Sequence, residues 1–160
     1  MICSIDPLEP RGPTFILNIH HIHPIIMVAL TTEMIEIFKA TKIFPLATSS
    51  KDGDPNVVPV GSVFLVDDET VWIGNQFMKQ TLSNLQENPK ACLYAWGPET
   101  KGCLKLKGNV KVHTSGADYE KMKDMVKARR ADLVCKALLE FKITEVYNCK
   151  SGPGAGSKLL

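Results

Sequence analysis

The sequence predicts a mainly β fold, a six-stranded antiparallel barrel with short helices at its periphery. Its apolar residues fall into short runs separated by turn-type segments, and the Asp-Gly pair within residues 51–54 is typical of a β-hairpin. Strands joined by hairpins make an antiparallel sheet, and a sheet of this size closes or packs on itself to hide its edges. The 160 residues, 44% of them apolar, are enough for one domain with a single substantial core.

The composition divides the chain into three regions. Residues 1–30 contain four prolines and are expected to form a poorly ordered extension. Their apolar run is too short and too polar for a membrane span. The three histidines within residues 20–23 are neighbours that cannot easily converge on one ion, so we expect no metal site. Residues 31–150 form the predicted domain, and residues 151–160 form a Gly-rich tail.

The domain is expected to begin with a helix and a hairpin. Thr31 can cap a helix over Glu33–Ala40, whose apolar residues fall on one face. Strands are expected at Phe44–Ser49 and Pro55–Val60, on either side of the hairpin turn. Pro59 interrupts the second strand, which indicates an edge, a bulge, or a backbone that something other than a strand approaches.

A second hairpin and a short helix follow. Ser62–Val66 and Val71–Ile73 are expected to pair around an acidic turn. The next helix, Lys79–Glu87, is expected to end at Asn88-Pro89 because proline cannot continue a helix. Ala91–Trp96 reads as the next strand.

The last part of the domain combines two strands and a helix. Cys103–His113 alternates between apolar and basic residues, and Gly108-Asn109 can bend it. Ser115–Asp118 resembles a capping box, which predicts a helix immediately after it. Leu139–Tyr147 is the last expected strand. The helix should turn four residues toward the core: Tyr119, Met122, Met125 and Val126.

Charge and cysteine content exclude several classes of protein. A net charge of +2 is too weak to predict a nucleic-acid partner, and the basic strand lacks the interleaved aromatic residues that RNA binding needs. The five cysteines are odd in number and none form a C-x-x-C pair, so a disulfide framework is not expected and a reducing, cytoplasmic setting is favoured. No Ser-His-Asp or Cys-His arrangement can be assigned, and the catalytic residues stay unknown.

The segment from Gly74 to Thr81 is the best candidate for a binding site. It lies between a strand end and a helix start, where free backbone N–H groups beside Lys79 and a hydroxyl make an anion site. Asn75 and Gln76 add hydrogen-bonding groups, and the following phenylalanine adds a ring surface. The alternative is an ordinary capped helix whose lysine is solvated, and the residues alone do not decide between the two.

The glycines of the tail do not form a nucleotide-binding motif. They stand at positions 152, 154 and 156, which is not the G-x-G-x-x-G spacing, and no helix follows them. Two interpretations stay open, a mobile tail and a flap that closes over a ligand.

These segments together resemble the FMN-binding split-barrel family, the group related to pyridoxamine 5′-phosphate oxidase. The likeness covers about residues 33–150. It rests on the hairpin Phe44–Gly53 with Pro55–Gly61, on Trp72–Asn75, and on Lys79–Ala91, which matches the Asn-Leu and Asn-Pro pattern of the family's helix.

The resemblance implies a homodimeric six-stranded antiparallel split β-barrel that holds FMN between its subunits. It further implies an FMN-dependent oxidoreductase, with a non-catalytic flavin- or other cofactor-binding module as the alternative. Related barrels also accept a deazaflavin, and neither a nucleic acid nor a membrane is expected as a partner. The phosphate would meet Lys79, Gln80 and Thr81. The flavin ring and ribityl chain would meet two further segments: Val58, Pro59, Val60, Gly61 and Ser62, and Asn75, Gln76 and Phe77.

Two departures from the family pattern bear on function. Family members commonly carry a basic residue at or immediately before the position of Thr81, whereas here Gln80 precedes it and the charge lies at Lys79. The chain also ends soon after the last strand and lacks the segment with which true pyridoxamine phosphate oxidases hold their substrate. That specific activity is therefore not expected.

Overall fold

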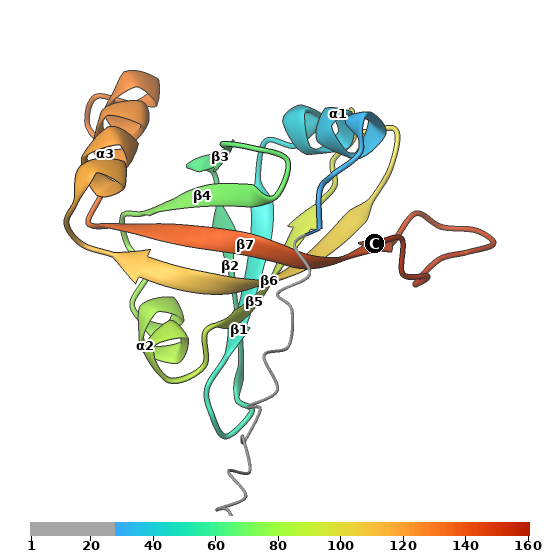
Figure 1. Ribbon diagram of the computed structural model, residues 1–160, viewed down its shortest axis with the longest axis horizontal. Coiled ribbons are helices and arrows are strands. Elements are labelled where there is room, and N and C mark those ends of the chain that lie inside the picture. The colour runs from blue at the N-terminus through green and yellow to red at the C-terminus, as the bar shows by residue number, and fades with distance from the viewer. Residues whose placement is uncertain (1–27) are drawn as a thin grey trace, which may run out of the picture.

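The computed structural model describes residues 28–160 and shows three helices and seven strands (Figure 1). The six-stranded barrel that was expected has one strand too few, although the segments expected from the residues already include β3, which pairs with β4 as the predicted second hairpin. In chain order the elements are α1 (Thr32–Ala40), β1 (Phe44–Ser49), β2 (Pro55–Val60), β3 (Val63–Leu65), β4 (Thr70–Asn75), α2 (Gln80–Glu87), β5 (Lys90–Ala95), β6 (Leu104–His113), α3 (Ala117–Arg129) and β7 (Ala137–Asn148).

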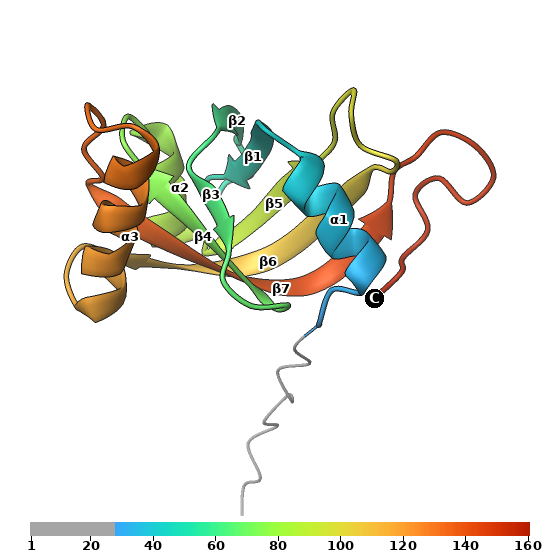
Figure 2. The same cartoon turned by 90° about the horizontal axis from the view of Figure 1, so that it is seen from above.

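All seven strands belong to one antiparallel sheet with the order β2-β1-β5-β6-β7-β4-β3. Its two edge strands, β2 and β3, are consecutive in the chain and are joined only by Gly61 and Ser62. The sheet must therefore curl until its edges meet at this corner, and it does so in two perpendicular views (Figures 1 and 2). The predicted mainly β, split-barrel architecture is confirmed.

The inside of the curl is filled by one apolar core. Strand alternation supplies it, as predicted for β6, where Leu104, Leu106 and Val110 are buried and the intervening lysines face outward. Pro59 lies on the edge strand β2, and an edge was one of the three explanations expected for a proline within a strand. The largest fully buried side chains of the core are Leu46, Ile73, Leu93, Leu106, Leu139, Phe141, Ile143, Val71 and Val146.

A bulge in β6 lets this strand follow the curl. The register with β7 shifts between Lys107 and Gly108, at the predicted bend. A Cβ atom at Gly108 would run into the Lys142 carbonyl oxygen and the Phe141 ring, so only glycine fits there.

Helix α1 begins and packs as the sequence predicts. The Thr31 hydroxyl accepts a hydrogen bond from the Met34 N–H (3.4 Å), and the apolar face of the helix enters the main core. Its Phe38 ring lies 4.7 Å from the Phe44 ring, measured between centroids.

Helix α3 covers the opposite face of the sheet, over β4 and β7. Met122 and Val126 are buried in a second apolar cluster with Trp72, while the two other residues of the predicted stripe are half-buried. The predicted capping box is wrong, because the N-cap is Gly116, with φ of 99°, and no side chain caps the helix. The helix starts one residue later than a Ser115 cap would require.

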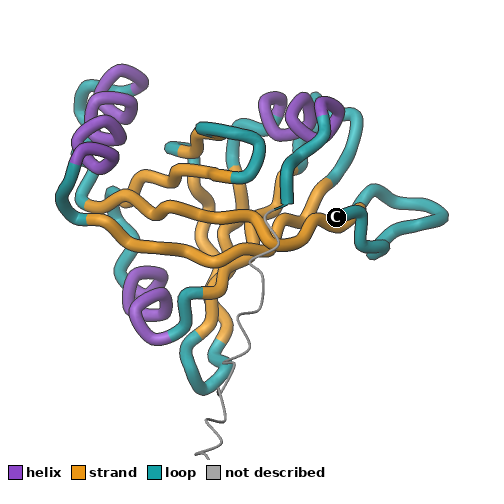
Figure 3. Tube along the Cα trace, viewed as in Figure 1, coloured by secondary structure: helices purple, strands orange, loops and turns teal. Residues whose placement is uncertain are grey.

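Both ends of the described chain are fastened to the sheet. Val28 and Leu30, which the sequence analysis assigned to the extension, are buried. The tail loops out and returns (Figure 3), so that the Leu159 N–H donates to the Val146 carbonyl oxygen (2.7 Å). This return covers the part of β7 that β4 does not reach, an arrangement different from both a mobile tail and a flap.

The remaining predictions about the first residues fall outside the described range. They concern residues 1–27, including the three histidines within residues 20–23. Within residues 28–160, no helix combines the length and the apolar character that a membrane crossing requires.

We expect Gly108→Ala to lower the free energy of unfolding by about 1–3 kcal/mol, because the added methyl overpacks the β6–β7 contact. Gly97→Ala is the matched control, since the nearest atom to its Cβ would lie 3.9 Å away, and it should change stability by less than about 0.5 kcal/mol. Urea unfolding of both variants measures the difference. Equal stability of the two would show that the bulge tolerates a side chain.

Candidate cofactor site

The predicted site residues lie in two segments that meet where the sheet closes. One runs from β2 through Gly61 and Ser62 into β3, and the other runs from β4 into α2. The Gly74 N–H donates to the Ser62 carbonyl oxygen (2.9 Å), and Gln76 Nε2 donates to Ser62 Oγ (3.1 Å). The fold thus brings Ser62 and Gln76 into direct contact.

Strand β2 presents an open edge to this corner. The turn closes on a hydrogen bond from the Ser50 N–H to the Asp54 carbonyl (3.0 Å), and hydrogen-bonded pairs alternate along an antiparallel ladder. Val58 and Val60 therefore direct their backbone groups to β1, whereas the carbonyl of Pro59 faces away from the sheet. Because prolines occupy two positions of β2 and lack N–H groups, a further strand cannot pair along this edge.

Arginine from the end of α3 completes the corner, which the sequence analysis did not predict. Arg129 Nη1 donates to the Gly61 carbonyl oxygen (2.7 Å), and its guanidinium lies 4.1 Å from the centroid of the Phe64 ring. A hollow of about 480 Å³ adjoins Gly61 and is lined by these residues together with Lys39 and Lys42, and by no carboxylate of the described chain. Lys39 is paired with Glu36 (3.5 Å) and Lys42 with Glu99 (3.2 Å), so Arg129 is the cation of this lining whose charge has no carboxylate partner within residues 28–160.

The turn between β4 and α2 is built by Asn75. This residue is 2% exposed; its Oδ1 accepts from the Met78 N–H (2.8 Å), and its carbonyl accepts from the Lys136 N–H (2.7 Å). The Asn75 side chain therefore shapes the segment. Phe77 instead projects from the turn and is 80% exposed, with Lys136 Nζ 5.9 Å from its ring centroid.

The first turn of α2 has the features of an anion site. Lys79 is the N-cap, no side chain caps the helix, and its first turn contains no acidic residue. The N–H groups at the helix start and their positive dipole end are thus left for a ligand or water. Lys79 and Gln80 are both exposed, and no ion pair within residues 28–160 involves Lys79.

Thr81 has a different environment from its two neighbours because it is fully buried. Its Oγ1 accepts from Asn56 Nδ2 (3.0 Å), and the same amide lies 3.1 Å from Thr48 Oγ1. Asn84 Nδ2 also donates to Thr48 Oγ1 (3.1 Å), and Asn84 Oδ1 accepts from Gln80 Nε2 (2.8 Å). This buried network fixes the start of α2 to the β1–β2 hairpin.

Three members of this network were not expected from the sequence: Thr48, Asn56 and Asn84. A signal was present for Asn56, since a polar residue stands there on the same side of the strand as Val58 and Val60. A polar residue on a buried face must find a hydrogen-bond partner, but the sequence does not show which one.

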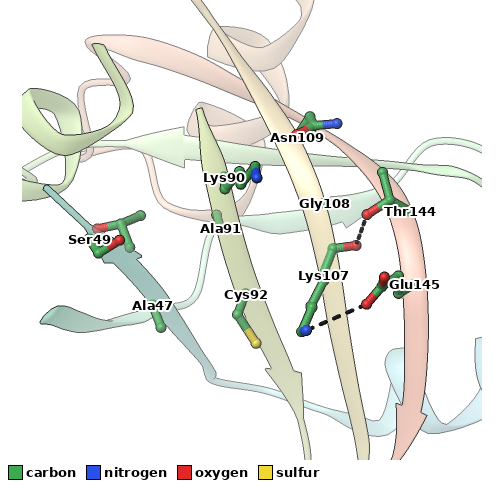
Figure 4. A pocket seen from close by; sticks show the side chains of 11 residues that line it. Ala47, Ser49, Lys90, Ala91, Cys92, Lys107, Gly108, Asn109, Thr144 and Glu145 are labelled. Atoms are coloured by element: carbon green, nitrogen blue, oxygen red, sulfur yellow. Dashed lines mark hydrogen bonds and ion pairs between the residues drawn. The ribbon is translucent and has the colours of Figure 1, made fainter. Parts of the chain in front are cut away.

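A larger hollow lies elsewhere, on the outer face of β1, β5, β6 and β7 (Figure 4). It measures about 590 Å³ and contains an ion pair between Lys107 and Glu145 (3.5 Å). A hydrogen bond from the Tyr147 hydroxyl (2.6 Å), with help from Lys107, holds the pKa of Glu145 below its usual value. None of the predicted cofactor residues lines this hollow.

Comparison with known proteins places the chain in a family. The family model described as pyridoxamine 5′-phosphate oxidase matches residues 30–150. The chain belongs to the pyridoxamine 5′-phosphate oxidase family. An uncharacterized relative, protein MJ0282 of Methanocaldococcus jannaschii, is 38% identical over 136 residues, which are 81% of this chain and 87% of the relative.

Solved structures of this family share the fold. HupZ of Group A Streptococcus superposes with a TM-score of 0.69 at 28% identity, covering 79% of this chain and 99% of HupZ. An FMN-binding protein of Syntrophomonas wolfei superposes with a TM-score of 0.62 at 16% identity, covering 71% of this chain and 80% of its own. These superpositions agree with the curled antiparallel sheet described above.

We expect Asn84→Ala to lower the free energy of unfolding by about 1–3 kcal/mol, because it removes a buried amide and leaves the buried hydroxyl of Thr48 without this partner. Ser83→Ala is the matched control on the same helix, and because Ser83 is exposed it should leave stability within about 0.5 kcal/mol. Chemical unfolding of both variants checks this. A loss in Asn84→Ala no larger than in the control would contradict the structural role of the network.

Proposed function

We propose that the protein binds FMN at the closing corner of the sheet and acts as an FMN-dependent oxidoreductase. The observation that carries the proposal is the α2 start: no side chain caps it, its first turn has no acidic residue, and Lys79 forms no ion pair with any residue of 28–160. Membership in the family and the shared fold of an FMN-binding protein from Syntrophomonas wolfei support it.

The residues at the α2 start fit a phosphate group. Backbone N–H groups at a helix start donate hydrogen bonds to phosphate oxygens, and the Lys79 ammonium adds a positive charge. Gln80 can donate from its amide but carries no charge. Thr81 holds the start of the helix in place, because its buried hydroxyl accepts a hydrogen bond from Asn56.

The neighbouring residues fit the remainder of the cofactor. The outward carbonyl of Pro59 offers an acceptor to ring or ribityl donors, and the exposed Phe77 offers an apolar surface. When bound, FMN supplies hydride or electron transfer. The chain's part is to bind, orient and shield the ring, tasks that require no general acid or base from the protein.

We further propose that two copies associate through the outer face of the β1–β2 hairpin. Directly opposed pairs on this face, Ala47 with Val57 and Pro45 with Pro59, leave a strip of apolar side chains. Val57 is 64% exposed, and Pro45 and Pro59 are exposed as well. An uncovered apolar surface of this kind marks a protein contact, and a homodimer would bury it next to the cofactor corner.

A non-catalytic flavin-binding module is the second candidate, and Gln80 is the observation that favours it. A neutral residue where relatives commonly carry a charge weakens phosphate binding, which suits a carrier that releases its ligand. Reproducible turnover with a reduced nicotinamide donor and a defined acceptor would exclude the carrier. A larger deazaflavin in place of FMN would be recognised by tighter binding in the same assay.

We expect Lys79→Ala to weaken FMN binding by about tenfold or more, because a charged contact to phosphate is worth about 1.5–3 kcal/mol. Riboflavin, which lacks the phosphate, should bind both proteins equally. Lys51→Ala, in the exposed hairpin turn, is the matched control, and Gln80→Lys should tighten FMN binding alone. Fluorescence titration measures the affinity of the wild type and of the three variants for each ligand. Equal losses for FMN and riboflavin would mean that the phosphate binds elsewhere.

We expect the wild-type protein to elute with about twice the chain mass of 17.7 kDa and Val57→Asp to elute as a monomer, because a buried charge at a dimer interface is costly. Val66→Asp, in the β3–β4 hairpin, is the control and should stay dimeric. Size-exclusion chromatography with light scattering gives the masses. A monomeric wild type would refute the interface.

A further inference from the structure

Two cysteines far apart in the sequence face each other across β6 and β7. Leu104 pairs with Asn148 at the end of this ladder, and continuing the register by one residue sets Cys103 opposite Cys149. The Cys149 N–H donates to the Cys103 carbonyl oxygen (2.8 Å), which confirms the pairing. Opposed residues of an antiparallel pair point to the same face, with Cα atoms about 5.5 Å apart when hydrogen-bonded.

The two thiols are also neighbours. Burial raises the pKa of the Cys103 thiol, and the adjacent Cys149 thiol raises it further. A hydrogen bond to the Cys103 thiol in turn raises the pKa of the Tyr94 hydroxyl. Cys103 is 5% exposed and Cys149 is half-buried, so the pair has one accessible and one protected sulfur.

Disulfides span Cα distances of about 4.4–6.8 Å, which includes the spacing of such a pair. We propose that Cys103 and Cys149 form a reversible disulfide with a low-molecular-weight disulfide, such as oxidised glutathione, as the oxidant. This modification site does not rest on the proposed flavin function.

The reaction runs by two exchanges. The Cys149 thiolate attacks one sulfur of oxidised glutathione, which forms a mixed disulfide and releases one glutathione thiolate. The Cys103 thiolate then attacks the Cys149 sulfur, which forms the internal disulfide and releases the second glutathione. Two protein thiols are oxidised, one glutathione disulfide is reduced to two thiols, and the two protein protons pass to the released thiolates.

The bond would fasten the segment where the tail leaves the sheet. Cys103 follows the loop of residues 97–102, and Cys149 precedes the tail whose return covers the edge of β7 (Figure 1). A disulfide here closes the long β6–α3–β7 segment and restricts the unfolded chain. Because Cys149 is partly exposed, reducing agents can reach the bond, as in disulfides that respond to redox conditions.

The other described cysteines have different surroundings. The Cys135 thiol is buried and donates to the Ala137 carbonyl oxygen (3.3 Å). Cys92 lies on the outer face of β5, opposite Lys107, and burial raises the pKa of its thiol. Cys135 therefore serves as an internal control, whereas Cys92, whose thiol pKa the Cys149 thiol also raises, is the competing partner that the test must distinguish.

The test equilibrates the full chain in buffers of reduced and oxidised glutathione, blocks free thiols by alkylation at low pH, and maps tryptic peptides. The expected product links residues 102–105 to residues 143–150, and dithiothreitol removes the link. Cys135→Ser should keep this linked peptide. Cys103→Ser should lose it and accumulate glutathione on Cys149 instead.

Thermal melting gives a second readout that does not depend on the variants' folding. The oxidised wild type should melt several degrees above the reduced wild type, because the closed loop restricts the unfolded state. Absence of the linked peptide in the most oxidising buffer would overturn the proposal. So would a link from residues 91–101 to 143–150, which would assign the reactive pair to Cys92 and Cys149.

Discussion

Closure of the sheet by a two-residue connection is the constraint on which the rest of this structure depends. Gly61 and Ser62 join strands that lie at opposite ends of the sheet order, so the sheet cannot stay open. Curling gives the core its interior and places the end of β2 against the turn after β4. The two segments of the candidate site are neighbours for this reason, and Ser62 is the residue that contacts both Gly74 and Gln76.

Once the sheet is closed, hydrogen bonds decide where α2 begins. Thr48 lies at the centre of these bonds, with Asn56 and Asn84 on either side of its hydroxyl. Thr48, Thr81 and Asn84 are buried, and a buried polar group without a partner is costly, so the network specifies one arrangement of helix and hairpin. The helix start is thereby held at the closing corner, with its N–H groups and Lys79 turned outward. The architecture thus couples a structural network to the exposed segment proposed as the anion site.

Much of the fold follows from local patterns in the sequence. The alternation in Cys103–His113 gave the faces of β6, and Thr31 gave the cap of α1, because both depend on residues close in the chain. The start of α3 was misjudged, since Gly116 displaced the Ser115 cap by one residue. The return of the tail to β7 depends on an edge left open by the length of β4, which no local pattern shows.

For the candidate site, too, the sequence indicates the local segments and not the contacts between distant residues. The prediction of an anion site at Lys79 follows from a strand end next to a helix start, and the resemblance to the family indicated the same segment. Arg129 could not be found, because it reaches Gly61 only when α3 packs near the closing corner. The burial of Thr81 also depends on a distant partner, Asn56, and it separates this residue, which holds the helix, from the exposed Lys79 and Gln80.

The most direct test of FMN binding at the closing corner is the absorbance spectrum of the protein after incubation with excess FMN and removal of free cofactor by desalting. We expect a yellow protein with flavin bands and about one FMN per chain. A colourless protein under these conditions would contradict the claim that the closing corner holds this cofactor, although the described fold would stand.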